Sequence, residues 1–258
     1  DAGGGEDYTT FTAAEAAVST LPATPNLVQR NEAIVYEAVA GTYSEDPVFD
    51  SNNLTTDATH NVTYKAAAGS EHGGDPASGV RIKATNINAT PVTDAHTNFV
   101  GIVFVEPDAT TGGYGVYLDA DGIKLLECVL DFRNQQRDAV QVLGGTVTDP
   151  TLLENCVVWC ESTFAARRAL GFPGASGTFY ATMSNCTVMA GASTPFGVNP
   201  GAGSTTCNLE INNCNLVGDG GYRTLNGGVI NFTGSNNISS IGANSRLPLP
   251  APQQALSQ

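Results

Sequence analysis

Four copies of one short, cysteine-centred pattern recur in the C-terminal half of the chain and constrain the fold more than any other feature. Each copy places an apolar residue three positions before a cysteine and another two positions after it. The cysteines follow one another at intervals of 28, 30 and 28 residues. A repeat of this length with a strand-like core is typical of a solenoid, in which each repeat buries its apolar face against its neighbours. The cysteines are Cys128, Cys156, Cys186 and Cys214.

The residues around each cysteine favour a parallel β-helix over a stack of α-helices. Apolar residues alternate there with others, which is the two-residue period of a β-strand. Asn155, Asn185 and Asn213 come directly before their cysteines, and Glu127 takes this place in the remaining copy. Asn tolerates the positive φ of a tight corner between two strands. We therefore predict an all-β fold, a right-handed parallel β-helix (solenoid), with these Asn at its corners.

Stacked coils of such a solenoid place the four cysteines above one another as a buried core ladder, at a spacing of roughly 4.8 Å. Disulfides between stacked cysteines are geometrically conceivable, but a ladder of thiols is the simpler account. No CxxC pair occurs, and His60, His72 and His96 all lie far upstream. Zinc sites have much tighter ligand spacing, so we expect no metal and no cofactor. No basic residue recurs beside the cysteines, which disfavours a thiol nucleophile.

The N-terminal segment predicts a short capping helix. Thr12 and Glu15 match the capping box, in which each side chain bonds a backbone N–H at the helix start. A helix over residues 12–20 suits the open end of a β-helix as a lid. Its packing residues are Phe11, Ala14, Ala17, Val18 and Leu21.

Further strands are expected at about 32–39, 61–66, 79–84 and 99–105, where apolar residues alternate or run together. The Pro-rich C-terminal segment is unsuited to a sheet, and its composition predicts a polyproline-like arm. The predicted organisation is a lead with capping helix (1–22), a parallel β-helix (23–242) and a C-terminal arm (243–258).

The net charge restricts the classes of molecule that the chain is expected to bind. Only 14% of residues are charged, and 25 Asp and Glu against 11 Lys and Arg give a net charge of −14. Nucleic acids and anionic membranes attract basic patches, so neither is expected as a partner. No apolar run approaches the length of a membrane span.

Many β-helices cleave polysaccharides, which requires two carboxylates held across a sugar, about 5–10 Å apart. Asp119 and Asp121 have a turn composition. Arg133 and Glu161 both fall five residues after a cysteine and are expected to stack as a surface ion pair. Coils of this length leave little chain for loops around a cleft. We therefore predict no catalytic residues and no enzyme activity, with a polysaccharide lyase or hydrolase as the alternative; further carboxylate candidates are Asp131 and Asp138.

Three residues are candidates for surface contacts. Trp159 lies three residues after Cys156, on the side predicted to face outward, where it suits a stacking platform or an interface anchor. An apolar pocket at a strand edge is the alternative place for it. Arg167 and Arg168 precede a Gly-rich turn, where they are either solvated or in contact with an acidic neighbouring subunit.

Residues 7–18 and 54–74, together with the Asn-Cys repeats, resemble tailed-phage virion structural proteins that carry a right-handed parallel β-helix domain. The resemblance covers most of residues 6–240, and the arm after about Ile241 departs from it. It implies a place on the virion exterior, as head decoration, fibre or tail-attached protein. Implied partners are other capsid or tail proteins, a trimer of the chain itself by analogy, and a host surface glycan. The alternative function is a tailspike-like protein that binds or degrades carbohydrate.

Overall fold

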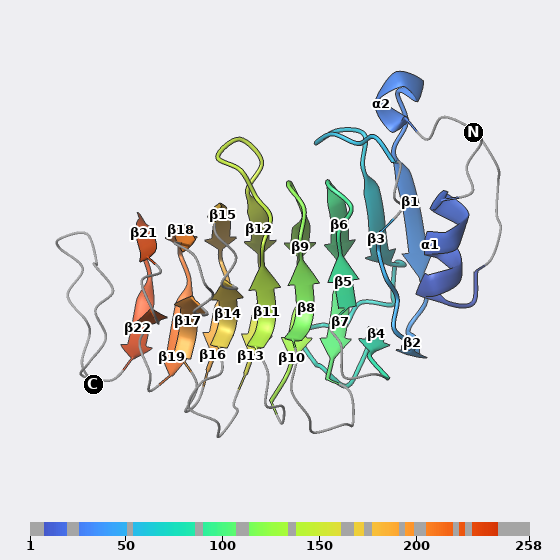
Figure 1. Cartoon of the computed structure of the whole chain (residues 1–258). Coiled ribbons are helices and arrows are strands. Elements are labelled where there is room, and N and C mark those ends of the chain that lie inside the picture. Colours follow the sequence, from blue (N-terminus) through green and yellow to red (C-terminus); the bar gives the residue numbers. More distant parts are fainter. Residues whose placement is uncertain are drawn as a thin grey trace.

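The computed structural model describes residues 8–19, 26–50, 54–85, 90–106, 114–133, 138–160, 168–172, 177–190, 194–198, 205–218, 222–224 and 229–241. These form three sheets in which every described strand pair is parallel, with two short helices near the N-terminus (Figure 1). The predicted all-β parallel β-helix with a short N-terminal helix is confirmed. The right-handed sense is the one expected of parallel strands joined by crossovers.

Sheet 1 stacks eight strands in the order β1-β3-β6-β9-β12-β15-β18-β21. Their bounds are β1 Ile34–Ala38, β3 Val62–Ala66, β6 Thr97–Val100, β9 Lys124–Leu126, β12 Thr151–Glu154, β15 Gly177–Ser184, β18 Thr205–Asn212 and β21 Val229–Ser235.

Sheet 2 stacks eight further strands, each directly following its sheet 1 neighbour in the chain. They are β2 Gly41–Ser44, β4 Val80–Lys83, β7 Ile102–Val105, β10 Val129–Asp131, β13 Val157–Trp159, β16 Thr187–Met189, β19 Asn215–Gly218 and β22 Ile238–Ile241.

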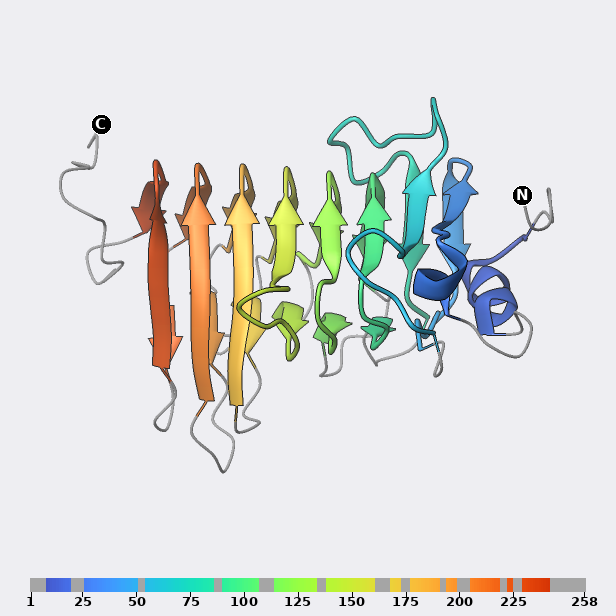
Figure 2. The ribbon, with the colours of Figure 1, turned by 90° about the horizontal axis from the view of Figure 1, so that it is seen from above.

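Sheet 3 has six strands, which close the coils that begin with β3, β6, β9, β12, β15 and β18. They are β5 Thr90–Val92, β8 Tyr114–Leu118, β11 Asp138–Val142, β14 Arg168–Phe172, β17 Thr194–Val198 and β20 Tyr222–Thr224. In the described part of the first coil the chain makes only an isolated bridge, Phe49 with Val92, to this sheet. One circuit through the three sheets is one coil. Seen from above, the coils follow one another in a row with α1 at one end and β21 at the other (Figure 2).

The corner between sheets 1 and 2 uses left-handed backbone, as predicted. Asn155, Asn185 and Asn213 have φ of 54°, 55° and 54°, and Glu127 has 55°. Each of these corner N–H groups donates to a carbonyl of the next coil, as from Asn155 to the Ser184 oxygen at 3.0 Å. Short polar side chains adopt this conformation at lower cost than bulky ones, which explains why Asn recurs here.

All four predicted ladder cysteines are buried, with at most 2% of the residue exposed. The register pairs Val129 with Val157, Val157 with Thr187, and Thr187 with Asn215, so the preceding cysteines stack coil on coil. Their thiols also donate hydrogen bonds, which the sequence did not predict. The Cys156 Sγ lies 3.2 Å from the Leu125 oxygen of the preceding coil, and Cys186 Sγ lies 3.3 Å from that of Leu153.

Helix α1 (Phe11–Ser19) packs against the first coils, as the lid prediction required. Phe11, Ala14 and Val18 are buried, and the Phe11 ring lies edge-on to Tyr43 at 5.1 Å. Ala17 is half-buried, and the predicted contact of Leu21 lies outside the described residues.

The predicted capping box is wrong. The helix begins one residue before Thr12, and the Thr10 hydroxyl caps it by accepting the Ala13 N–H at 3.0 Å. Glu15 is buried and instead accepts the Asp50 N–H at 3.1 Å. Glu45, far along the chain, takes the place of the predicted acidic cap. Its carboxylate accepts the N–H groups of Phe11 and Thr12 at 2.8 and 2.9 Å.

Two further local predictions need correction. Residues 99–105 are two strands, because Gly101 at φ 67° turns the chain from β6 into β7. A second helix, α2 (Leu27–Arg30), was missed, although Asn26 is a good N-cap and accepts the Gln29 N–H at 2.9 Å. The strands predicted at 32–39, 61–66 and 79–84 are present as β1, β3 and β4.

Candidate functional site

The outer face of sheet 2 carries a cluster of an acid, an arginine and a tryptophan. In β13 the side chain of Val158 is buried and its neighbour Trp159 is partly exposed, so Trp159 lies on the outer side as predicted, although its indole nitrogen is buried. Arg133 lies over the indole ring, 4.0 Å from its centroid. The same guanidinium donates two hydrogen bonds to Asp131, from Nε to Oδ1 at 2.7 Å and from Nη2 to Oδ2 at 2.8 Å. This pair lies within one coil. The predicted stacking of Arg133 with Glu161 lies outside the described residues.

Trp159 begins an apolar column on this face. Strand pairing aligns Asp131, Trp159, Met189 and Val217 in four successive coils. Met189 is partly exposed and Val217 is 39% exposed. Trp, Met and Arg are the residues enriched at protein interfaces, whereas Lys and Glu are depleted there. We call Asp131, Arg133, Trp159, Met189 and Val217 the sheet 2 contact column.

Arg168 is not a surface residue, contrary to the prediction. Only 6% of it is exposed, and it begins β14 directly beside Asp138 of β11. Asp138 is 1% exposed and accepts the Arg168 backbone N–H at 3.0 Å and its Nε at 3.2 Å. Gln141, also buried, points its amide at the second carboxylate oxygen at 3.5 Å. This buried ion pair joins two coils, and the predicted contact of Arg167 lies outside the described residues.

Asp119 and Asp121 occupy the corner where sheet 3 leads into sheet 1. The Asp121 carboxylate accepts the Gly145 N–H of the next coil at 3.0 Å, the turn role expected from its composition. Burial raises the pKa of Asp119, while a hydrogen bond from Tyr117 opposes this shift.

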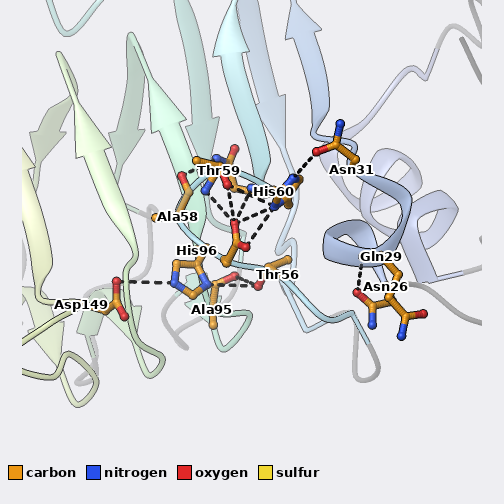
Figure 3. A network of polar contacts seen from close by, with 12 residues as sticks. Asn26, Gln29, Asn31, Thr56, Ala58, Thr59, His60, Ala95, His96 and Asp149 are labelled. Carbon is orange, nitrogen blue, oxygen red and sulfur yellow. Dashed lines mark hydrogen bonds and ion pairs between the residues drawn. The ribbon is translucent and has the colours of Figure 1, made fainter.

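The same corner, in the coils nearer the N-terminus, holds a polar network that was not predicted from the sequence (Figure 3). His60 Nδ1 lies 2.9 and 3.0 Å from the two Asp57 oxygens, and its Nε2 lies 3.0 Å from Asn31 Oδ1. His96 Nδ1 lies 3.3 Å from Thr56 Oγ1, and its Nε2 lies 3.7 Å from Asp149 Oδ1. Only the Asp57-x-x-His60 spacing could have indicated one of these contacts from the sequence.

The third histidine, His72, attaches the loop between β3 and β4 to the corner at Glu127. It lies between β3 and β4, in the segment that Figure 2 shows reaching out beyond the strand ends. Its Nε2 donates to the Glu127 oxygen at 2.6 Å, and its Nδ1 accepts the Gly74 N–H at 2.8 Å. This contact bridges from the second coil to the fourth, across the Gly101 corner.

No protein-family model matches the chain. Neither the curated proteins nor the solved structures compared with it give a match. Within the described residues, no three His, Cys, Asp or Glu side chains gather as metal ligands would. Neither helix in the described part of the chain is long and apolar enough to cross a membrane.

Proposed function

We propose that this chain is a non-enzymatic structural protein of the exterior of a tailed-phage virion, as head decoration, fibre or tail-attached protein. The non-enzymatic part of the proposal rests on the contacts of three candidate carboxylates, each of which is already paired within the fold. Asp131 is gripped by Arg133, Asp138 is buried against Arg168, and Asp121 accepts a backbone N–H. The virion setting rests on the sequence resemblance.

The sheet 2 contact column supports a role through contacts with other proteins. A stacked Trp–Arg pair is the kind of anchor that contributes most of the energy of an interface. Its capsid or tail partner is expected to bury Trp159 together with Met189 and Val217.

Location on the particle is the direct test. Electron microscopy of virions carrying a labelled copy of the chain should show the label on the exterior. Trp159→Ala should reduce incorporation, whereas Val35→Ala, on the exposed outer face of β1, should not. A label absent from particles, or equal incorporation of both variants, would contradict the proposal.

The alternative is a tailspike-like protein that binds or degrades carbohydrate, and the partly exposed Trp159 ring suits a stacking platform for a sugar. Depolymerisation of a host polysaccharide by the purified chain, abolished by Asp119→Asn but retained by Asp75→Asn in the exposed loop, would establish it. A polysaccharide bound without cleavage would indicate the binding form.

A further inference from the structure

The outer face of sheet 2 carries an apolar strip beside the sheet 2 contact column. Residues of β7 and β10 alternate between the core and this face. Ile102 and Leu130 belong to the core cluster, whereas Val103 and Val129 point the other way. These two valines pair across neighbouring coils, and Val157 pairs with Val129 in the coil after them. We call Val103, Val129 and Val157 the outer strip; it runs alongside the contact column, nearer the corner with sheet 1.

Two residues of the outer strip are buried although they face away from the core. Val103, in the third coil, is 0% exposed, and Val129, in the fourth, is 1% exposed. Val157 has the equivalent place in the fifth coil and is partly exposed. A segment outside the sheet therefore covers the strip in the third and fourth coils and ends before the fifth.

The loop between β3 and β4, residues 67–79, lies at these two coils (Figure 2). It leaves the second coil and passes the corner of the third at Gly101, which has no side chain where the later coils have Glu or Asn. In the fourth coil the His72 Nε2 donates to the Glu127 oxygen at 2.6 Å. Glu127 lies two residues before Val129. The reach of the loop thus matches the coils in which the outer strip is buried.

Hydrogen bonds inside the loop give it a shape of its own. The His72 oxygen accepts the Asp75 N–H at 2.9 Å and the Ser78 hydroxyl at 2.8 Å. Near its two ends, Gly69 and Gly79 have φ of 80° and 76°, a backbone conformation that glycine adopts without strain. The bonds that shape the loop are different from the bond that attaches it at Glu127. The loop is therefore built to leave the outer strip as one piece, with the glycines as hinges.

We propose that the loop 67–79 is a strap over the outer strip, and that the virion partner of the sheet 2 contact column displaces it. This inference rests on the proposed function, because it concerns the partner of the same face. With the strap displaced, Val103 and Val129 join Val157 and Trp159 in one apolar surface. The partner segment that replaces the strap is apolar and offers a hydrogen-bond donor to the Glu127 oxygen, as His72 does.

A strap of this kind lowers the apparent affinity of the partner, because only molecules with the strip uncovered bind in full. Weakening the attachment of His72 at Glu127 raises the uncovered fraction and leaves the contact column unchanged. A stronger complex is therefore the signature of displacement. A partner that contacts the column alone is indifferent to the strap.

Binding of the dye anilinonaphthalene sulfonate to the purified full chain tests the cover. His72→Ala should increase its fluorescence, because the dye binds exposed apolar surface, and adding Val103→Thr with Val129→Thr should remove the increase. His72→Gln, which keeps a donor, and Glu71→Gln, on the exposed side of the loop, should match wild type. Replacing residues 70–78 by two glycines makes the loop too short to reach Glu127. If neither this variant nor His72→Ala binds more dye than wild type, the strap is refuted.

Competition for assembling virions tests the displacement. When wild type and variant are supplied in equal amounts, His72→Ala should be incorporated several-fold in excess, and Glu71→Gln equally with wild type. Equal incorporation of a His72→Ala protein that binds extra dye would overturn the displacement, while a loss of incorporation by Trp159→Ala would still support the proposed function. Normal incorporation of Trp159→Ala would instead remove the proposed function, and the inference with it.

Discussion

At the scale of single residues, the position directly after the corner between sheets 1 and 2 selects a small hydrogen-bond donor. In the last described coil Asn237 occupies the position of the cysteine and makes corresponding hydrogen bonds. Its Nδ2 donates to the Ile211 oxygen at 2.7 Å, and its Oδ1 accepts the Cys214 N–H at 2.9 Å. In the coils before it, Cys214 donates to the Met183 oxygen and accepts the Cys186 N–H. The cysteines therefore act as weak polar groups in the core as well as apolar ones.

This environment predicts unreactive thiols. Burial raises the pKa of Cys156 well above its ordinary value, and the neighbouring Cys156 thiol, with burial, raises that of Cys186 to about 12. Thiolate is the reactive form, and at about pH 8 almost none is present. A disulfide reagent should modify none of the six cysteines in the native protein and all six in denaturant. Stoichiometric modification without unfolding would contradict the buried ladder.

At the scale of elements, segments distant in sequence complete one another. Helix α1 lacks an acidic residue in its first turn, and Glu45, just after β2, supplies the negative charge there. A carboxylate that accepts N–H groups at a helix start is stabilised by the orphan donors and by the helix dipole. These hydrogen bonds attach helix α1 to the end of strand β2.

Glu45→Ala should destabilise the protein by about 1–2 kcal/mol, because two helix N–H groups lose their acceptor. Glu37→Ala is the matched control. It breaks the exposed pair with Lys65, whose atoms lie 2.7 Å apart, and should cost at most about 1 kcal/mol. Chemical denaturation of both variants measures the difference, and equal losses would exclude the capping role.

The ion pair between β11 and β14 predicts a larger effect. Arg168→Met leaves the Asp138 carboxylate buried without its cation and should cost about 3–5 kcal/mol. Adding Asp138→Asn to this variant should restore part of the loss, since no buried charge then remains. Denaturation midpoints of the single and double variants give the coupling energy. Additive losses would show that the two side chains act independently.

The elements that the sequence predicted share a local signal, and those that it missed depend on distant partners. Asn before Cys encodes a corner within two residues, so the ladder and its corners followed from the repeat. Asp138 and Arg168 lie 30 residues apart, and no spacing rule connects them, so Arg168 was assigned to the surface. Glu45 and His96 are similar cases, because their partners become neighbours only once the coils are stacked.

At the scale of the whole molecule, the solenoid is a row of coils whose two ends differ. The first coil is covered by α1, with Phe11 and Val18 buried against the core. In the described part of the other end, β21 pairs with β18 alone, and its residue Val229 is 49% exposed. Interior coils have neighbours on both sides. Because the stability of a solenoid is close to a sum over neighbouring repeats, local opening should begin at the ends.

Hydrogen exchange across the chain should therefore be slowest in the central strands β9 to β16 and fastest in β21 and β22. The lid makes a further prediction. Glu45→Ala loosens α1 and should speed exchange in β1 and β2, which lie under the helix, while β18 and β19 should keep their rates because many coils separate them from it. Mass spectrometry of peptides from wild type and variant measures both effects. If the variant instead accelerated exchange equally along the whole row, the coils would open as one cooperative unit, and contacts at either end would control the stability of the entire solenoid.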